Sequence, residues 1–340
     1  MKKRKQAVLP PLTDAGYHRD IFLMMIPLLL MAVYLYGWRP ALLSAAAVVT
    51  ANICDRIVAR LRGRHYDARD MSSEAFAFVL VMLMPASVDY YVVVSAALFT
   101  VMVGKEAFGG YGSYPFHPTA VGFVMAAISW PEQVFRYPQP FSRLPLGSCA
   151  DVTLVSSIPH TMKSGGLPTV STLDMWLGDY AGPMGATAAL IVVSCAVLLL
   201  VQKRISWRVP VLFLVSSAAV AFLFPRLGGV PMAWPWEFAA ERIAATKYEL
   251  LSGGTLFAAV FLFSEPVTMP KNKHSQTVYA VLLGFMSMMF RYFGSYETGA
   301  CFALLVVNSV SGWLDRAVLR SEAKKARRLE AKKEVPGNES

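Results

Sequence analysis

Long apolar stretches alternate with short polar or basic segments along almost the whole chain. A helix needs about 20 mainly apolar residues to cross the roughly 30 Å hydrocarbon core of a bilayer. The pattern predicts ten such spans, at residues 20–37, 40–58, 72–87, 89–104, 115–130, 184–202, 207–225, 249–264, 276–293 and 297–314. The predicted fold class is therefore an all-α polytopic membrane protein.

The composition excludes two other classes of protein. Of the 340 residues, 55% are hydrophobic and 16% are charged, and the mean hydropathy is +0.46. A soluble domain carries about 25% charged residues, and a disordered chain combines low hydrophobicity with high charge. Neither description fits this chain.

The basic residues indicate an orientation in the membrane. The net charge is +10, and most Lys and Arg residues fall on the cytoplasmic side when the N-terminus is placed there. Ten spans then put both termini in the cytoplasm. We interpret the basic surplus as this topological signal and expect no nucleic-acid partner. The run from Ser321 to Glu334 predicts a charged helix, either solvated or lying on anionic membrane lipid.

One long loop of mixed polarity divides the spans into two groups of five. We expect a cytoplasmic N-terminal segment (1–19), a first five-helix repeat (20–130), an extracytoplasmic loop (131–182), a second five-helix repeat (183–314) and a basic cytoplasmic tail (315–340). FVLVMLMPAS at 78–87 is echoed by FAAVFLFSEP at 257–266. Because five is odd, the second copy enters the membrane from the opposite side, which predicts an inverted repeat.

A glycine-rich segment, GKEAFGGYGSYPFHPTAVG at 104–122, is the first candidate for chemistry. Gly109, Gly110 and Gly112 let the backbone approach a flat ring closely, and the aromatic residues between them can stack on it. The segment is interpreted either as a tight cytoplasmic turn or as a loop that binds a planar aromatic ligand.

Glu265 in FLFSEPVTMP is the second candidate. It stands at the end of a predicted span, where Pro266 breaks the helix, and an ionisable residue at that depth is a functional candidate. The alternative is an interfacial carboxylate that meets water or pairs with Lys271 or Lys105.

We expect no metal site and no catalytic residue. The four cysteines form no CxxC pair, and His160 in the long loop has no acid or metal-ligating partner at a recognisable spacing. Arg291, Glu297 and Asp315 stand at span ends and are interpreted as interfacial anchors.

Four blocks, taken in chain order, resemble one known family. They are GKEAFGGYGSYPFHPTAVGFVMAAISWP (104–131), LGDYAGPMGATAALIVVSCAVLLLVQKRISWRVPVLFL (177–214), FLFSEPVTMP (261–270) and GSYETGACFALLVVNSVSGWLDR (294–316). The family is that of the D subunit of the Rnf ion-translocating electron-transport complex and the B subunit of the sodium-pumping quinone reductase. The resemblance covers nearly the whole chain. It implies ten helices in an inverted repeat related to ammonium and urea channels.

The resemblance also implies FMN in the large outer loop, joined by a phosphoester to a hydroxyl. Alignment with the family puts Ser157 at the acceptor position, although the Gly and Ala of the family's motif are missing before it. Thr172 is the second choice and Thr187, in Met-Gly-Ala-Thr, the third. Loss of the covalent flavin is the remaining alternative.

A second, non-covalent flavin is implied near the glycine-rich segment and the Glu265 segment. His117 and Pro118 stand where the family has Asn-Pro, and Glu265-Pro266 where it has Asp-Pro, with Thr268 two residues further on. Both replacements keep a polar group and the helix-breaking proline. The cofactor is expected to be FMN, with riboflavin as a further candidate.

The function that this resemblance implies is that of a membrane subunit in a flavin-dependent, ion-translocating complex of the bacterial cytoplasmic (inner) membrane. Electrons pass through the bound flavin while Na⁺ or H⁺ crosses the membrane. The partners are the other subunits of the Rnf-type complex, and the isolated chain is expected to be inactive. The alternative is a channel or transporter of the ammonium or urea type without flavin.

Overall fold

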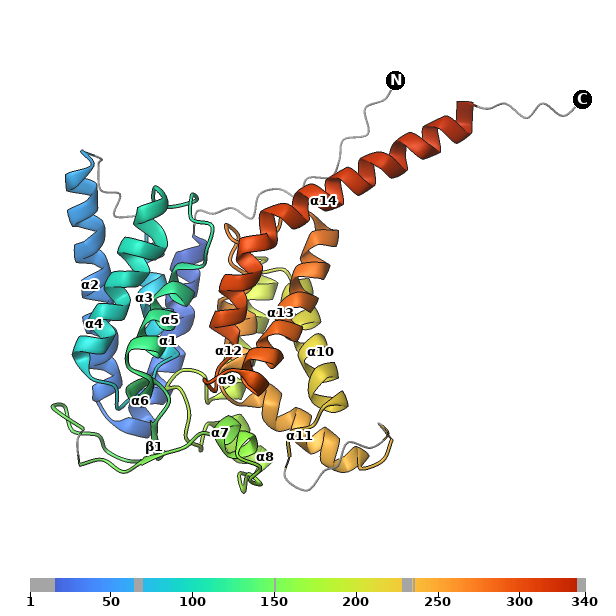
Figure 1. The fold of residues 1–340 in the computed structure, drawn as a ribbon. Helices are drawn as coiled ribbons and strands as arrows, with labels where there is room; N and C mark the ends of the chain where they lie inside the picture. Colours follow the sequence, from blue (N-terminus) through green and yellow to red (C-terminus); the bar gives the residue numbers. More distant parts are fainter. Residues whose placement is uncertain (1–15, 64–69, 150, 228–233, 235, 335–340) are drawn as a thin grey trace, which may run out of the picture.

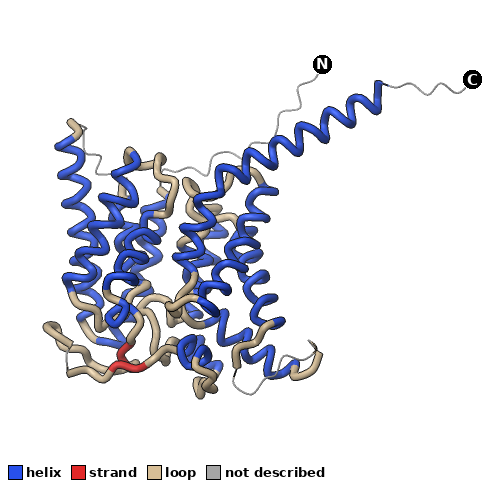
Figure 2. Tube along the Cα trace, in the orientation of Figure 1, coloured by secondary structure: helices blue, strands red, loops and turns tan. Residues whose placement is uncertain are grey.

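Helices make up nearly all of the regular structure in the described part of the computed structural model (Figure 2). The structure describes residues 16–63, 70–149, 151–227, 234 and 236–334. The chain runs through α1 (Tyr17–Tyr36), α2 (Arg39–Leu61), α3 (Ser72–Met82), α4 (Tyr90–Phe99), a π-helical segment (Thr100–Lys105), a 3₁₀ turn (Glu106–Phe108), α5 (Pro118–Ser129), α6 (Pro131–Val134), β1 (Tyr137–Pro138), β2 (Leu154–Val155), α7 (Ile158–Lys163), α8 (Thr172–Leu177), α9 (Ala189–Val201), α10 (Arg208–Leu223), α11 (Ala239–Leu251), α12 (Thr255–Phe261), α13 (Lys273–Phe293) and α14 (Ala300–Glu334).

The helices form two groups side by side (Figure 1). The blue-to-green helices α1 to α5 make one group, and α9 to α14 make the other. We call the end where α1 begins and α14 leaves the bundle the terminal end. The opposite end, which carries α6, α7, α8 and α11, is called the loop end. There, β1 and β2 pair antiparallel, with Tyr137 opposite Val155.

Among the described residues, four helices are long and apolar enough to cross a membrane. They are Tyr17–Tyr36, Arg39–Leu61, Tyr90–Phe108 and Ala300–Ser321, and four further apolar helices are shorter. Large apolar side chains such as Leu30, Val49 and Ile53 lie exposed on the first two helices, as expected of a surface in contact with lipid. The helical membrane class is supported, while the count of ten spans stays a prediction.

Two short helices, α3 and α12, end inside the bundle. Beyond α3, other parts of the protein form hydrogen bonds with the backbone carbonyl groups. After α3, Arg39 donates from Nε to the carbonyl of Ala86 (3.0 Å) and from Nη2 to that of Val88 (2.9 Å). The N–H of Met184 donates to the carbonyl of Met84 (3.0 Å). Irregular backbone at membrane depth needs such partners because hydrocarbon offers none. The second interruption follows α12 and contains Glu265.

The basic tail is helical, as predicted, because α14 continues without a break to Glu334. The remaining tail residues, 335–340, and residues 1–15 of the predicted N-terminal segment lie outside the described residues. The predicted loop 131–182 is described except for residue 150 and lies at the loop end, where it forms α6, the β1–β2 pair, α7 and α8.

Candidate functional site

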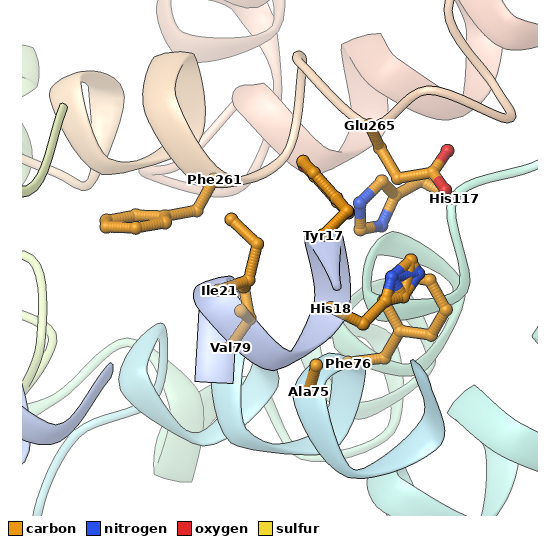
Figure 3. Close-up of a pocket in the computed structure, with 9 residues that line it drawn as sticks. All are labelled: Tyr17, His18, Ile21, Ala75, Phe76, Val79, His117, Phe261 and Glu265. Carbon is orange, nitrogen blue, oxygen red and sulfur yellow. The ribbon is translucent and has the colours of Figure 1, made fainter. Parts of the chain in front are cut away.

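A buried pocket at the terminal end lies between the two groups of helices (Figure 3). The side chains that line it come from the start of α1, from α3, from the residue before α5, and from α12 and the interruption after it. They are Tyr17, His18, Ile21, Ala75, Phe76, Val79, His117, Phe261 and Glu265. The cavity measures about 10 Å³, which is room for one water molecule.

Glu265 organises the interruption after α12 through four hydrogen bonds. Its Oε1 accepts from the Tyr114 hydroxyl (2.8 Å). Its Oε2 accepts from the backbone N–H of Val267 (3.0 Å) and from the N–H (2.7 Å) and hydroxyl (3.0 Å) of Thr268. The alternative pairing of Glu265 with Lys105 or Lys271 is not formed between these described residues. Glu265 instead links the glycine-rich segment, through Tyr114, to the second group of helices. Thr268 holds the other carboxylate oxygen with two hydrogen bonds.

Two histidines in this pocket have no hydrogen-bond partner among the described residues. His18 is 6% exposed and His117 1% exposed, and neither nitrogen of either ring is bonded. The ring of Phe76 lies against both, with centroids 4.9 and 5.3 Å away. A neutral imidazole carries one donor and one acceptor, and buried polar groups are normally paired. The pocket therefore has free polar capacity for a ligand or water.

The three predicted glycines shape the turn beside the pocket and do not line it. Gly109, Gly110 and Gly112 have φ values of 115°, 94° and 80°, a region that other residues rarely adopt. The turn places the Tyr111 ring edge-on to His18, at a centroid distance of 5.3 Å. Tyr111 is 38% exposed, so the ring that contacts the buried imidazole also reaches the surface.

A second polar cluster at the terminal end was not predicted. Lys105 is 2% exposed, and its Nζ donates to Asp55 (3.2 Å), Asp70 (3.4 Å) and Ser73 (2.8 Å). Burial raises the pKa of Asp70, but the charge of Lys105, two hydrogen bonds from Ser72 and the electrostatic effect of His18 lower it. The pKa of Asp70 therefore lies below its usual range. A lysine inside an apolar stretch was the available signal.

Ser157, the first-choice flavin acceptor, lies buried at the loop end in contact with two ionisable residues. Its hydroxyl donates a hydrogen bond to Glu297 Oε2 and accepts the backbone N–H of His160 (3.3 Å). Nδ1 of His160 lies 3.3 Å from Glu297 Oε1. His160 thus has the acidic partner that sequence spacing concealed, and Glu297, 6% exposed, is no interfacial anchor.

Burial sets the acidity of Glu297. It raises the pKa to about 7, against the lowering effects of the Ser157 hydrogen bond and of the charges on Arg291 and Lys163. A carboxyl with this pKa exchanges a proton near neutral pH. The cluster Ser157–His160–Glu297 can therefore hold either a proton or a negative charge beside the serine hydroxyl.

The other two candidate acceptors have different surroundings. Thr172 is exposed, and its hydroxyl accepts from Lys247 Nζ (2.9 Å). Thr187 is fully buried, and its hydroxyl has no partner among the described residues. Thr172 is the candidate most open to a modifying enzyme. Ser157 is the one that also contacts the loop before α14.

Comparison with known proteins gives one family. The model described as the NQR2, RnfD, RnfE family matches residues 13–324. The D subunit of the ion-translocating oxidoreductase complex of Escherichia fergusonii is 27% identical over 320 residues, which cover 85% of this chain and 88% of the relative. The D subunit of the same name from Escherichia coli (strain K12) is 26% identical with the same coverage.

Proposed function

From the premise that the chain belongs to the NQR2, RnfD, RnfE family of ion-translocating oxidoreductase membrane subunits, we propose that it binds flavin and passes electrons through it within an Rnf-type complex. Na⁺ or H⁺ crosses the membrane as the electrons move. The relatives are named as subunits of a complex, which supports further subunits as partners in a bacterial membrane.

The observation that carries this proposal is the pair of unpartnered buried imidazoles, His18 and His117, in a pocket that also contains Glu265. The isoalloxazine ring of FMN or riboflavin is flat and has donors and acceptors along one edge. Unpaired imidazole nitrogens fit that edge, and the Phe76 ring fits its face.

The present cavity is smaller than the ring, so the glycine-rich turn has to open. The Tyr111 ring meets His18 edge-on, and Gly109, Gly110 and Gly112 give this turn its backbone freedom. We propose that Tyr111 swings away as the ring enters. When bound, the flavin supplies the redox chemistry, while His18 and His117 orient its polar edge and the apolar walls exclude water.

We propose Ser157 as the acceptor of a covalent FMN on the outer loop, ahead of Thr172 and Thr187. The charge of Lys163 acts on Glu297, the carboxyl that Ser157 contacts, so a cation is available there for a phosphate, and Glu297 can donate a proton to the phosphate when neutral. Thr172 is favoured by exposure and by Lys247. In the alternative, the loop carries no covalent flavin at all.

We propose the inverted repeat and the cytoplasmic termini as the arrangement of this chain. Two corresponding helices, α3 and α12, are short, and each is followed by an interruption that contains Pro85 or Pro266. In an inverted repeat, such a pair of interrupted helices would enter the membrane from opposite sides. The anionic inner surface of the membrane would then face the basic tail.

Flavin content tests the proposal. Flavin released by denaturing the purified complex should fall strongly in His117→Leu, because the polar edge of the ring loses a partner. His274→Leu changes an exposed histidine and should leave flavin content unchanged. A colourless wild-type protein, or equal flavin in both variants, contradicts the pocket assignment. The colourless protein would favour the channel alternative.

In-gel fluorescence after denaturation tests the acceptor, because only a covalent flavin survives. We expect the signal to disappear in Ser157→Ala and to persist in Thr172→Ala and Thr187→Ala. Loss in Thr172→Ala with persistence in Ser157→Ala would reverse our order. No fluorescence in any of the proteins would establish that the loop flavin has been lost.

A further inference from the structure

Large aromatic side chains are exposed at the loop end, where α10 and α13 end and α11 begins (Figure 1). Trp234 and Trp236 are 66% and 71% exposed, and their rings stack on each other at a centroid distance of 5.1 Å and an angle of 9°. Phe224, Phe238 and Phe293 are exposed as well. We call these residues the aromatic rim. Exposed apolar side chains that gather in one place mark an interaction surface.

Buried hydrogen bonds hold the start of α11 against the end of α10. Arg242 is buried, and its Nη1 donates to the carbonyls of Phe222 (2.9 Å) and Leu223 (3.1 Å), the last two residues of α10. Its Nε donates to the carbonyl of Glu237 (3.1 Å). The segment that carries Trp236 is therefore fixed at the level where α10 ends.

A cation connects the end of α13 to the same place. The guanidinium of Arg226 lies over the rings of Tyr292 and Phe293, 5.0 and 5.6 Å from their centroids. These are the last two residues of α13, and Arg226 follows the end of α10 by three residues. A guanidinium binds a phosphate through two parallel hydrogen bonds. The rim thus combines apolar rings with a cation suited to an anionic group.

An exposed apolar surface leads away from the rim along the two helices that end there. Val211 and Val215 on α10 and Val281 and Phe285 on α13 lie exposed, as side chains in contact with lipid tails do. The aromatic rim lies where this surface stops at the loop end. Tryptophan is enriched at this level in membrane proteins, because its ring meets hydrocarbon while its N–H meets the headgroups.

Charged residues between the rings favour lipid over a partner protein. Glu237 and Glu241 are exposed beside the indoles and beside Ile243, and burying these carboxylates against another subunit without a cation would be costly. The interface of a membrane offers water and hydrocarbon within a few ångströms. A helix of mixed polarity such as α11, which lies across the loop end (Figure 1), is typical of that environment.

We infer that the aromatic rim lies in the phospholipid interface of the membrane, with the stacked indoles of Trp234 and Trp236 just below the headgroups and the Arg226 guanidinium bound to a lipid phosphate. This contact fixes the depth of the loop end in the membrane. It does not depend on a flavin anywhere in the chain.

Quenching of tryptophan emission by brominated phospholipids tests the position of the indoles, because bromine quenches only at short range. The complex is reconstituted into phosphatidylcholine that carries bromine either near the headgroup or near the end of the acyl chain. The difference between the wild type and Trp234→Phe/Trp236→Phe gives the contribution of the pair. We expect several-fold stronger quenching of this contribution by the shallow bromine than by the deep one.

Trp176→Phe, at a partly exposed indole of the outer loop, is the matched control and should remove none of the quenched emission. The single variants Trp234→Phe and Trp236→Phe give the same comparison if the double variant does not fold. Arg226→Gln should lower the amount of phospholipid phosphate that stays bound through purification in detergent. Arg143→Gln, at an exposed arginine of the outer loop, should leave it unchanged.

Each outcome decides the question. Shallow quenching that is lost in the double variant and kept in Trp176→Phe supports the lipid contact. Equal quenching of the wild type and the double variant overturns it, and so does stronger quenching by the deep bromine. Quenching of the pair in the chain reconstituted alone but not in the complex would show that another subunit covers the rim. Unchanged phosphate in Arg226→Gln overturns the phosphate contact. All of these results leave the proposed flavin function untouched, because none of them measures flavin.

Discussion

The histidine pocket at the terminal end and the Ser157–His160–Glu297 cluster at the loop end each contain a buried carboxyl, in different surroundings. Glu265 accepts four hydrogen bonds and fixes a broken helix. Glu297 accepts one from Ser157, contacts a half-exposed histidine, and has a pKa of about 7. The first carboxyl is structural, whereas the second is free to change its protonation.

Space and polarity are also divided between the two regions. The terminal pocket has unpaired imidazoles and room for one water, while the cavity lined by Tyr296 and Thr298 at the loop end has about 180 Å³ and one unpaired hydroxyl, that of Thr298. Unpaired imidazole nitrogens in a pocket too small for a ligand imply that this pocket has to open before it binds one.

The largest expected effect concerns Lys105, whose cluster supports the terminal end. Lys105→Met leaves Asp55 and Asp70 without their buried cation, which should cost about 3–5 kcal/mol of stability. The thermal unfolding midpoint in detergent measures this loss. Lys271→Met, at an exposed lysine, should change it little. A small effect at Lys105 would show that this cluster contributes little to the stability of the terminal end.

A pH dependence should come next, and Glu297 at the loop end should contribute to it near neutral pH. The pKa of Glu297 is raised from 4.5 to about 7 in the folded protein, so the folded state binds more protons between these values. Protonated Glu297 therefore contributes its full stabilisation below pH 4.5. This stabilisation is lost as the pH rises through 7 and the buried carboxyl ionises. The loss between roughly pH 5 and pH 8 should be about 2 kcal/mol.

Unfolding midpoints across this range, compared with those of Glu297→Gln, measure the effect. The variant should lack the Glu297 part of the pH dependence because its amide does not titrate. Equal pH profiles for the wild type and Glu297→Gln would contradict the difference that we draw between Glu265 and Glu297.

A smaller effect is expected at Glu265. Glu265→Gln keeps the shape of the side chain and can keep an oxygen toward Val267 and Thr268, but the amide oxygen is a weaker acceptor than a carboxylate oxygen and the Tyr114 hydroxyl has to reverse its hydrogen bond, which should cost about 1–2 kcal/mol. The unfolding midpoint should fall without a new dependence on pH. Glu237→Gln, at an exposed glutamate, serves as the control. An unchanged midpoint in Glu265→Gln would mean that its four hydrogen bonds contribute little.

The last prediction concerns sidedness and involves no change in stability. Cys149 is partly exposed in the loop-end segment, whereas Cys54, Cys195 and Cys301 are buried. A membrane-impermeant maleimide applied to the outer face should label the wild type and not Cys149→Ser. Because burial raises the pKa of the Cys149 thiol, labelling should speed up as the pH rises. Labelling only from the inner face would reverse the proposed orientation.

Much of the membrane architecture was predictable because its signals are local. A helix that faces lipid must be apolar along its length, so the first two helices and α14 are evident in the sequence. The interruptions were visible too, since Pro85 and Pro266 cannot continue a helix. The short lengths of α3 and α12 were not, because the same apolar composition suits a full span and a short helix buried in protein.

The candidate sites were predictable only in part. Sequence reasoning selected His117 and Glu265, which meet in one pocket, but missed His18, which looks like an ordinary residue at a helix start. It placed Glu297 at an interface and left His160 without a partner. Both errors have the same cause, because the two residues lie far apart in the chain and only folding brings them together.

The sequence by itself determined the helical membrane class, the family and the broken segments, since each depends on residues that are neighbours along the chain. The tertiary structure decided which polar groups are paired. Hydrogen bonding and burial depend on what packs around a side chain, and that is why Glu265 became a structural carboxyl, Glu297 a titrating one, and His18 and His117 a pair still in need of a partner.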